Sequence, residues 1–169
     1  KFLDYRDVKD KYDHVVSIEM IEAVGEEYMD KYFETIKKVL NKDGTAAIQG
    51  IAIKNELFNR YRANEDFIQK YIFPGGFLPS INFMEKLIKK NDLKLEKINT
   101  YSDDYARTLA TWRENFLGVW DKISPLGFDD YFKRMWEFYL SYCEGGFKSR
   151  NINLIQFSMS NRYSPWKNL

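Results

Sequence analysis

The sequence predicts an α/β domain, in which strands and helices alternate along the chain. Two short apolar stretches rich in β-branched residues, residues 14–18 and 45–53, flank a helical pattern over residues 26–40. A strand, a helix and a second strand in this order form a βαβ unit, whose two strands lie parallel. The length supports one domain, because 169 residues can bury a substantial core.

The first strand, residues 14–18, reads His-Val-Val-Ser-Ile and does not alternate cleanly between apolar and polar residues. Such a run is typical of a strand that is covered on both faces, as in a parallel sheet. A covered strand needs a neighbour on each edge, and residues 45–53 supply one of them. We therefore expect the other neighbour to come from sequence that precedes Lys1.

The helix between the two strands is predicted from apolar residues spaced three and four positions apart. They are Tyr28, Met29, Tyr32, Phe33, Ile36, Val39 and Leu40. A turn over residues 41–44 is expected to end this helix. Residues 54–80 are first polar and then aromatic, and four Pro and Gly residues disfavour regular structure there. A loop of this length is usually functional, for example as a lid over a site.

The rest of the chain predicts a helix, a strand, two aromatic helices and a final strand. Their expected ranges are residues 81–90, 92–101, 104–122, 129–147 and 152–158. Ser80 is expected to cap the first of these helices. The last two strands are expected to form the antiparallel edge of a mixed sheet, with the two aromatic helices inserted between them.

Composition argues against several kinds of site. The chain has 26 Lys and Arg residues against 25 Asp and Glu residues, and its formal charge of +1 does not favour nucleic acid. The single cysteine, Cys143, cannot form an internal disulfide, and one histidine is too few for the usual zinc sites, so no metal is expected. The 13 Phe, 12 Tyr and 4 Trp residues fit a large core, an apolar pocket or a membrane-facing surface.

Residues of three types, glutamate, tyrosine and cysteine, are candidates for a catalytic or ligand-binding role. Glu19 and Glu22 follow the first strand, where α/β proteins bind ligands, and one of them is a candidate base or ligand. Spacing alone favours the alternative, that both are solvated carboxylates at a helix start. Tyr105 begins a helix, and its hydroxyl either faces a pocket or packs. Cys143 has no His near it in sequence, so an inert thiol is favoured over a nucleophile.

Seven motifs in order make the chain resemble the cyclopropane-fatty-acyl-phospholipid synthases and the related mycolic acid cyclopropane synthases. They are DYRD from residue 4, SIEMIEAVG from residue 17, FIQKYIFPGG from residue 67, DYARTL from residue 104, FKRMW from residue 132, YCEGGF from residue 142 and INLIQ from residue 152. The resemblance spans nearly the whole chain. It implies a Rossmann-like fold of the class I methyltransferases that use S-adenosylmethionine. Residues 1–169 would be the C-terminal part of that domain, without its N-terminal cofactor-binding half, so the chain alone is expected to be inactive.

In that family a cis double bond of a phospholipid acyl chain attacks the methyl group of S-adenosylmethionine, and the cation loses a proton to close a cyclopropane. The resemblance therefore implies S-adenosylmethionine as co-substrate and a bound bicarbonate as base. Aromatic faces suit the cation, and a water-poor site protects it. Two alternatives remain open: a fatty-acid methyltransferase that makes methyl-branched products, and a non-catalytic lipid-binding fragment.

The resemblance also implies site residues. Glu22 and Tyr105 would hold the bicarbonate, together with the backbone of Ile51. Gln49 stands where several members have His, and its amide can bond an oxyanion but cannot become cationic. Cys143 matches a cysteine regarded as a candidate active-site residue, although its surroundings favour packing. The implied cofactor-binding residues are Asp4, Tyr5, Arg6 and Ser17.

Location and partners follow from the implied substrate. The partner would be phospholipid acyl chains at the membrane surface, with the loop from Phe73 to Leu78 over the lipid entrance. The protein is expected to be cytoplasmic and peripheral to the inner face of the membrane. The near-neutral charge provides no polybasic anchor. A tendency to form homodimers is also implied.

Overall fold

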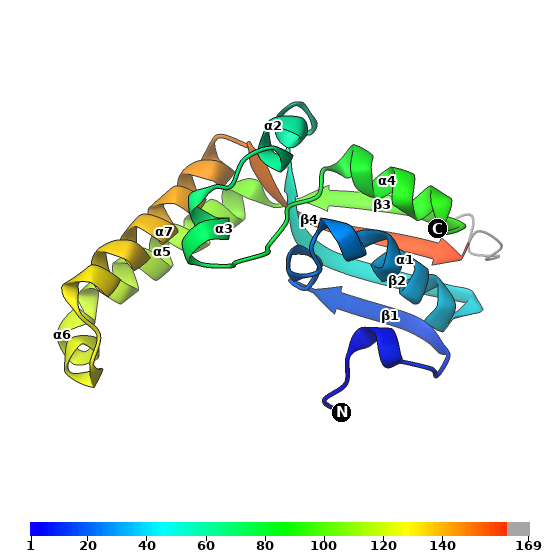
Figure 1. Ribbon diagram of the computed structural model, residues 1–169, viewed down its shortest axis with the longest axis horizontal. Coiled ribbons are helices and arrows are strands. Elements are labelled where there is room, and N and C mark those ends of the chain that lie inside the picture. Colours follow the sequence, from blue (N-terminus) through cyan, green and yellow to red (C-terminus); the bar gives the residue numbers. More distant parts are fainter. Residues whose placement is uncertain (162–169) are drawn as a thin grey trace. The chain divides into compact units, whose positions relative to one another are not determined.

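The computed structural model describes residues 1–161, which fall into two compact units. Unit 1 contains residues 1–100 and the described chain from residue 154 onward, and unit 2 contains residues 101–153. Figure 1 shows unit 1 as a sheet with helices packed on it and unit 2 as a helical hairpin. Each unit is described by itself below.

Unit 1 is built on a four-stranded sheet with the strand order β1-β2-β4-β3. The strands are β1 (Tyr12–Ile18), β2 (Leu40–Ile53), β3 (Leu93–Thr100) and β4 (Ile152–Asn161). β1 pairs with β2 in parallel, with Ile18 opposite Gln49. β3 pairs with β4 in the antiparallel sense. The predicted α/β class, the βαβ unit and the antiparallel edge are thus confirmed.

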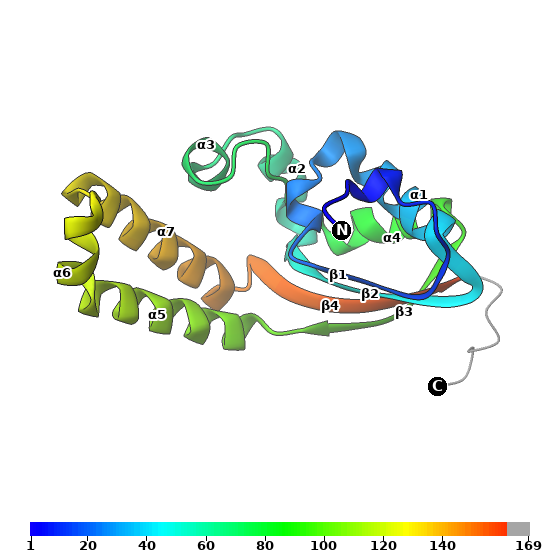
Figure 2. The ribbon, with the colours of Figure 1, turned by 90° about the horizontal axis from the view of Figure 1, so that it is seen from below.

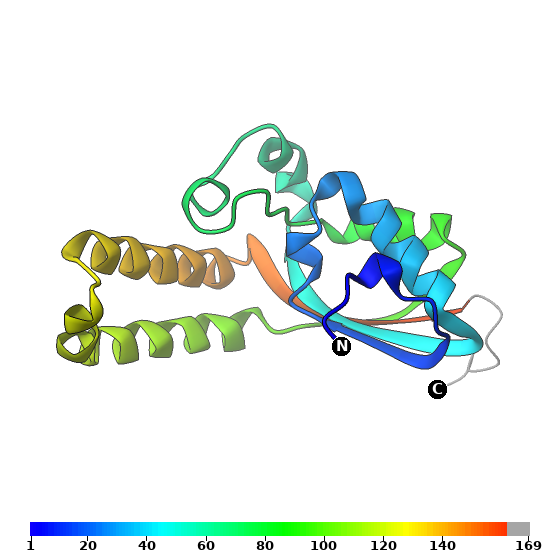
Figure 3. The ribbon, with the colours of Figure 1, turned by 60° about the horizontal axis from the view of Figure 1, so that its bottom comes forward.

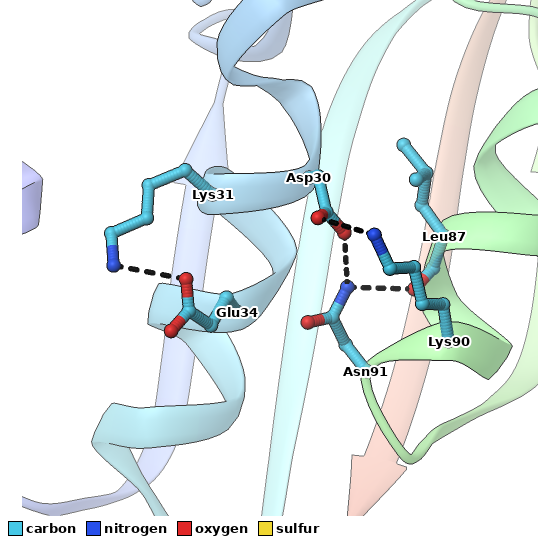
Figure 4. A network of polar contacts seen from close by, with 6 residues as sticks. All are labelled: Asp30, Lys31, Glu34, Leu87, Lys90 and Asn91. Atoms are coloured by element: carbon cyan, nitrogen blue, oxygen red, sulfur yellow. Dashed lines mark hydrogen bonds and ion pairs between the residues drawn. The ribbon is translucent and has the colours of Figure 1, made fainter.

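Two helices cover one face of this sheet, α1 (Met29–Val39) and α4 (Ile81–Lys90) (Figure 2). The apolar spacing of α1 buries one side of it, with Met29 and Phe33 fully enclosed. Ser80 caps α4 as predicted, since its hydroxyl accepts a hydrogen bond of 3.3 Å from the N–H of Phe83. Asp30 joins the two helices through Lys90 at 2.7 Å and Asn91 at 3.0 Å (Figure 4). A Lys31–Glu34 pair at 2.9 Å lies beside it on α1.

The opposite face of β1 is open among residues 1–161. Val16 and Ile18 are 67% and 62% exposed, although the sequence predicts a strand covered on both faces. Their β-branched side chains explain that prediction, but α1 and α4 lie on the other side of the sheet (Figure 2). β2 is the neighbour of β1 in the described sheet, so the second neighbour expected from sequence before Lys1 stays a prediction.

Two local predictions are wrong. Residues 41–44 do not form a separate turn, because β2 begins at Leu40 directly after α1 and runs through them. Residues 54–80, which we call the lid, contain regular structure: a 3₁₀ turn at Asn55–Leu57, α2 (Phe58–Arg62) and α3 (Phe67–Tyr71). α3 is stabilised by a capping box, in which Asp66 and Gln69 each satisfy a backbone N–H of the other.

Unit 2 is the helical insertion predicted before the last strand. It consists of α5 (Ser102–Gly118), α6 (Trp120–Ile123), a 3₁₀ turn at Ser124–Leu126 and α7 (Asp130–Lys148). α5 and α7 run side by side as a hairpin (Figure 3). The buried Glu144 joins them through an ion pair with Arg113 at 3.0 Å. Of the aromatic residues on α7, Phe132 and Trp136 stack at 5.6 Å, whereas Tyr131 is exposed.

None of the helices within residues 1–161 combines the length and the apolar character that crossing a membrane requires.

Candidate functional site

The candidate site begins where β1 ends and β2 continues. The last bond between these strands runs from the N–H of Glu19 to the carbonyl of Gln49, at 3.0 Å. Alternate N–H groups of a strand point to the same edge, so the N–H of Ile51 has no residue of β1 opposite it. The chain instead turns through a short 3₁₀ helix, Ile21–Ala23, and the Glu22 carboxylate accepts a hydrogen bond from the N–H of Ile51.

Gly50 allows this carboxylate to approach the strand. A Cβ at this position would lie 2.4 Å from Cγ2 of Ile21 and 3.0 Å from Oε1 of Glu22. Every residue larger than glycine would therefore displace the turn that carries Glu22. A glycine within a strand signals a close approach but does not show which group approaches, so the sequence alone does not give Gly50 this role.

The second oxygen of Glu22, Oε2, is buried and has no hydrogen-bond partner among the described residues. Burial raises the pKa of Glu22 to about 7. Backbone hydrogen bonds, one of them from Ile51, oppose this shift, and the charge of Glu19 adds to it. A buried polar atom without a partner is unusual in a folded protein and indicates a ligand-facing group. The interpretation of Glu22 as a solvated carboxylate is therefore wrong.

Gln49 is held from both sides. Its amide nitrogen donates to Oε1 of Glu19 at 3.0 Å, and its amide oxygen accepts from Nε2 of Gln156 on β4 at 2.7 Å. Glu19 adopts a positive φ of 52° at the end of β1, which directs the chain into the turn before Glu22. Sequence reasoning did not identify Gln156 as a site residue, because 107 positions separate it from Gln49.

The predicted cofactor-binding residues lie in the same unit. Asp4 caps a short 3₁₀ turn, Tyr5–Asp7, and pairs with the Arg6 guanidinium at 2.8 Å, which lowers the pKa of Asp4 to about 2. The ring of Tyr5 packs edge to face on Tyr32 at 5.9 Å, and the Tyr32 hydroxyl donates to Oγ of Ser17 at 2.8 Å. Tyr32 thus connects two of the predicted residues, although the sequence showed it only as part of an apolar helix face.

Tyr32 also connects this group to Glu22. Burial raises the pKa of the Tyr32 hydroxyl, and the charge of Glu22 raises it further. The structure therefore brings Tyr5, Ser17, Tyr32 and Glu22 into one neighbourhood at the carboxyl end of β1. Their roles in binding remain predictions.

The lid is fastened to the Glu22 turn. The N–H of Phe77 donates to the backbone carbonyl of Glu22 at 2.9 Å, and the N–H of Ile53 at the end of β2 donates to the carbonyl of Pro79 at 3.0 Å. The ring of Phe77 is buried and packs against Phe58, with ring centres 5.8 Å apart. The segment from Phe77 to Pro79 is thus bonded both to the turn that carries Glu22 and to the end of β2.

Tyr105 and Cys143 belong to unit 2. Tyr105 lies on α5, where its ring packs edge to face on Phe147 at 4.7 Å and on Trp112 at 6.2 Å. Cys143 is half-buried on α7, next to Glu144. Within residues 1–161, His, Cys, Asp and Glu side chains do not gather into a group that could hold a metal ion.

Replacing Cys143 with serine is expected to leave turnover within about threefold of the unchanged protein, because a half-buried thiol on a packed helix acts chiefly through its size. Turnover of lipid by the purified complete protein measures this. Complete loss of turnover in a variant with an unchanged circular dichroism spectrum would show that the thiol takes part in the reaction.

Comparison of the sequence with known proteins identifies the family of this chain. The family model described as mycolic acid cyclopropane synthetase matches residues 1–157. The chain is 40% identical over 163 residues to the tuberculostearic acid methyltransferase of Mycobacterium tuberculosis, covering 96% of the chain and 38% of that protein. It is 35% identical over 157 residues to the cyclopropane-fatty-acyl-phospholipid synthase of Escherichia coli, covering 93% of the chain and 40% of that protein. The chain thus spans about two fifths of the length of these relatives.

Solved structures agree on the fold. A mycolic acid cyclopropane synthase complexed with SAH and CTAB superposes with a TM-score of 0.83 at 24% identity, over 92% of this chain and 57% of that one. A cyclopropane synthase from Mycobacterium tuberculosis gives a TM-score of 0.81 at 22% identity, with the same coverage of 92% and 57%. The predicted Rossmann-like class I methyltransferase fold is confirmed.

Proposed function

Because the chain belongs to the mycolic acid cyclopropane synthetase family, we propose that it is the C-terminal part of an S-adenosylmethionine-dependent enzyme that modifies unsaturated lipids. The proposed product is a cyclopropane ring at the cis double bond of a phospholipid acyl chain. The observation that carries this proposal is Glu22, a buried carboxylate with an unpartnered oxygen at the carboxyl end of a parallel strand. The 35% identity to a cyclopropane-fatty-acyl-phospholipid synthase supports the choice of product.

The described residues fit one side of S-adenosylmethionine. When bound, this co-substrate supplies an electrophilic methyl group. Ser17 would contribute a hydroxyl that still has its own proton to donate, because its oxygen is the acceptor of the Tyr32 bond. Tyr5 would contribute an aromatic ring fixed by Tyr32, and the Asp4–Arg6 pair would contribute polar contacts beside it.

Glu22 fits a small anion that carries its own proton, such as bicarbonate. Bicarbonate, when bound, supplies the base for proton removal. The free Oε2 of Glu22 can accept a hydrogen bond from a hydroxyl while ionised and can donate one while protonated, and a pKa of about 7 makes both forms accessible near neutral pH. The burial of Glu22 limits its contact with water, which would protect a cationic intermediate.

A second candidate is a methyltransferase that makes methyl-branched fatty acids. The 40% identity to a tuberculostearic acid methyltransferase favours it. Gln49 bears on this choice, because its amide is held by Glu19 and Gln156 and cannot become cationic as a His can. The two candidates share the fold, the cofactor and Glu22, and differ in how the cation loses its proton.

Mass spectrometry of lipids from cells that express the complete protein separates the candidates. The cyclopropane proposal expects a mass gain of one methylene, loss of the double bond and the high-field proton signals of a cyclopropane in NMR. A methyl branch in place of the ring would establish the second candidate. Cells that express the Glu22→Gln variant are the matched control and should show unmodified acyl chains.

The proposed partner is the acyl chain of a phospholipid at the inner face of the membrane, with the protein itself in the cytoplasm. Flotation of the complete protein with vesicles of unsaturated phospholipid tests this location. Recovery of the protein only in the lipid-free fractions would contradict it.

A further inference from the structure

One peptide group of the lid is hydrogen-bonded on both sides. It is the peptide between Gly76 and Phe77, whose N–H donates to the backbone carbonyl of Glu22 at 2.9 Å. Its carbonyl accepts a hydrogen bond of 3.1 Å from Nε2 of Gln69. This peptide therefore stands between the Gln69 side chain and the turn that carries Glu22.

Gln69 is itself held in place. Its amide oxygen accepts from the N–H of Asp66 at 3.1 Å, and its own N–H donates to Oδ1 of Asp66 at 2.9 Å. The side chain of Gln69 thus uses one end to cap α3 and the other end to hold the Gly76 carbonyl. Both ends of the amide are occupied, which fixes the orientation of the group.

We infer that Gln69 is a positioning residue for Glu22, because it orients the Gly76–Phe77 peptide so that the peptide N–H reaches the Glu22 carbonyl. This inference rests on the proposed function in taking Glu22 as the reactive-site carboxylate. Gly75 has a positive φ of 81°, and a Cβ there would meet no atom within 4 Å, so the backbone just before this peptide has few steric constraints of its own. Without the Gln69 bond, the Gly76–Phe77 peptide can rotate, and its N–H then loses the bond to the carbonyl of Glu22.

The consequence for Glu22 follows from the position of its turn. The turn is fixed on one side by the Ile51 N–H and on the other by the Phe77 N–H. Loss of the second contact frees the turn and admits water to the carboxylate. Two titratable groups act on Glu22 from the elements around it, Glu19 on the turn after β1 and Tyr32 on α1. Neither changes when Gln69 is replaced, and the charge of a glutamate at that position would only raise the pKa of Glu22, so a downward shift of this pKa reports on the lid.

The test is Gln69→Glu in the complete protein. A glutamate at this position keeps a side-chain oxygen that can accept the hydrogen bond from the N–H of Asp66. It loses the N–H donor to the Gly76 carbonyl and places a negative charge beside that carbonyl. We expect kcat to fall between about tenfold and a hundredfold, while KM for S-adenosylmethionine stays within about twofold. We also expect the titration of Glu22, followed by NMR of ¹³C-labelled side-chain carboxyls, to move down from about 7 toward its ordinary range.

Asp66→Ala is the matched control, because it removes the other half of the capping box and leaves the Gln69 donor to Gly76 in place. It should lower the stability of α3 but leave kcat and the titration of Glu22 unchanged. Equal losses in the two variants would assign the effect to helix stability and overturn the inference, as would an unchanged titration in Gln69→Glu. The NMR readout needs no turnover, so it distinguishes failure of this inference from failure of the proposed function.

Discussion

Replacing Glu22 with glutamine is expected to lower turnover by about a thousandfold or more, while S-adenosylmethionine binds nearly as before. Glutamine keeps an oxygen that can accept from the Ile51 N–H, but it places an amide NH₂ where the unpartnered Oε2 now lies. That group can neither accept a hydrogen bond nor act as an acid or a base near neutral pH. Turnover and calorimetric cofactor binding on the same preparation measure the two effects. Near-normal turnover would remove Glu22 from the proposed site.

The same variant has an expected signature in stability. Burial raises the pKa of Glu22 from its ordinary 4.5 to about 7, so the folded state binds the proton more tightly than the unfolded state. The favourable contribution of protonated Glu22 is complete below about pH 4.5 and is lost as pH rises through 7. A glutamine at position 22 does not titrate, so Glu22→Gln does not lose stability in this way. As pH rises from about 4.5 to 7, the free energy of unfolding of the variant should therefore increase relative to that of the unchanged protein by up to about 3 kcal/mol. Urea unfolding at pH 5 and pH 8 measures the change, and equal differences at both values would contradict it.

Replacing Gly50 with alanine is expected to have the second largest effect. The added Cβ would lie 2.4 Å from Cγ2 of Ile21, which is fully buried and cannot simply turn away. The turn must shift, and Glu22 shifts with it, because the same Cβ lies 3.0 Å from its Oε1. We expect a loss of stability of about 1–3 kcal/mol and a loss of turnover of about a hundredfold, since small displacements at a reacting site are costly.

The control for Gly50→Ala is Gly118→Ala at the end of α5, where a Cβ meets no atom within 4 Å. This substitution should be neutral or slightly stabilising, because alanine favours a helix over glycine. Thermal unfolding and turnover of both variants give the comparison. If Gly50→Ala matches Gly118→Ala in both measurements, Gly50 does not set the position of Glu22.

The main elements were predictable because each carries a local signal. The apolar spacing of residues 28–40 predicts the helix observed as α1, Met29–Val39, and the serine at position 80 predicts the start of α4, which is also observed. α3 was missed although its signal, Asp66 followed three positions later by Gln69, is present in the sequence. The glycines and prolines that follow α3 predict irregular structure, which conflicts with this capping signal. A helix of five residues also has little apolar periodicity of its own.

The site was less predictable, because its state depends on contacts between distant parts of the chain. Because Glu22 follows a strand, the sequence makes it a candidate base or ligand, but the sequence does not show whether its carboxylate is solvated. Its bond to the Ile51 N–H depends on the unequal lengths of β1 and β2, and its turn is bonded to the lid, which the chain reaches some fifty residues later. The partners of Gln49 and the space above Gly50 are likewise tertiary properties. The family resemblance assigns Glu22 a role that spacing alone disfavours, and this role stays a prediction.

The contacts that fix Glu22 come mostly from the main chain, and this affects which substitutions the site can accept during evolution. The N–H groups of Ile51 and Phe77 donate to Glu22 whatever side chains those positions carry. Positions 51 and 77 can therefore accept other apolar residues without loss of the donors, and proline alone removes them. Variation at these two positions among relatives should stay apolar and should exclude proline. A residue that looks replaceable in an alignment can thus still supply an indispensable hydrogen bond.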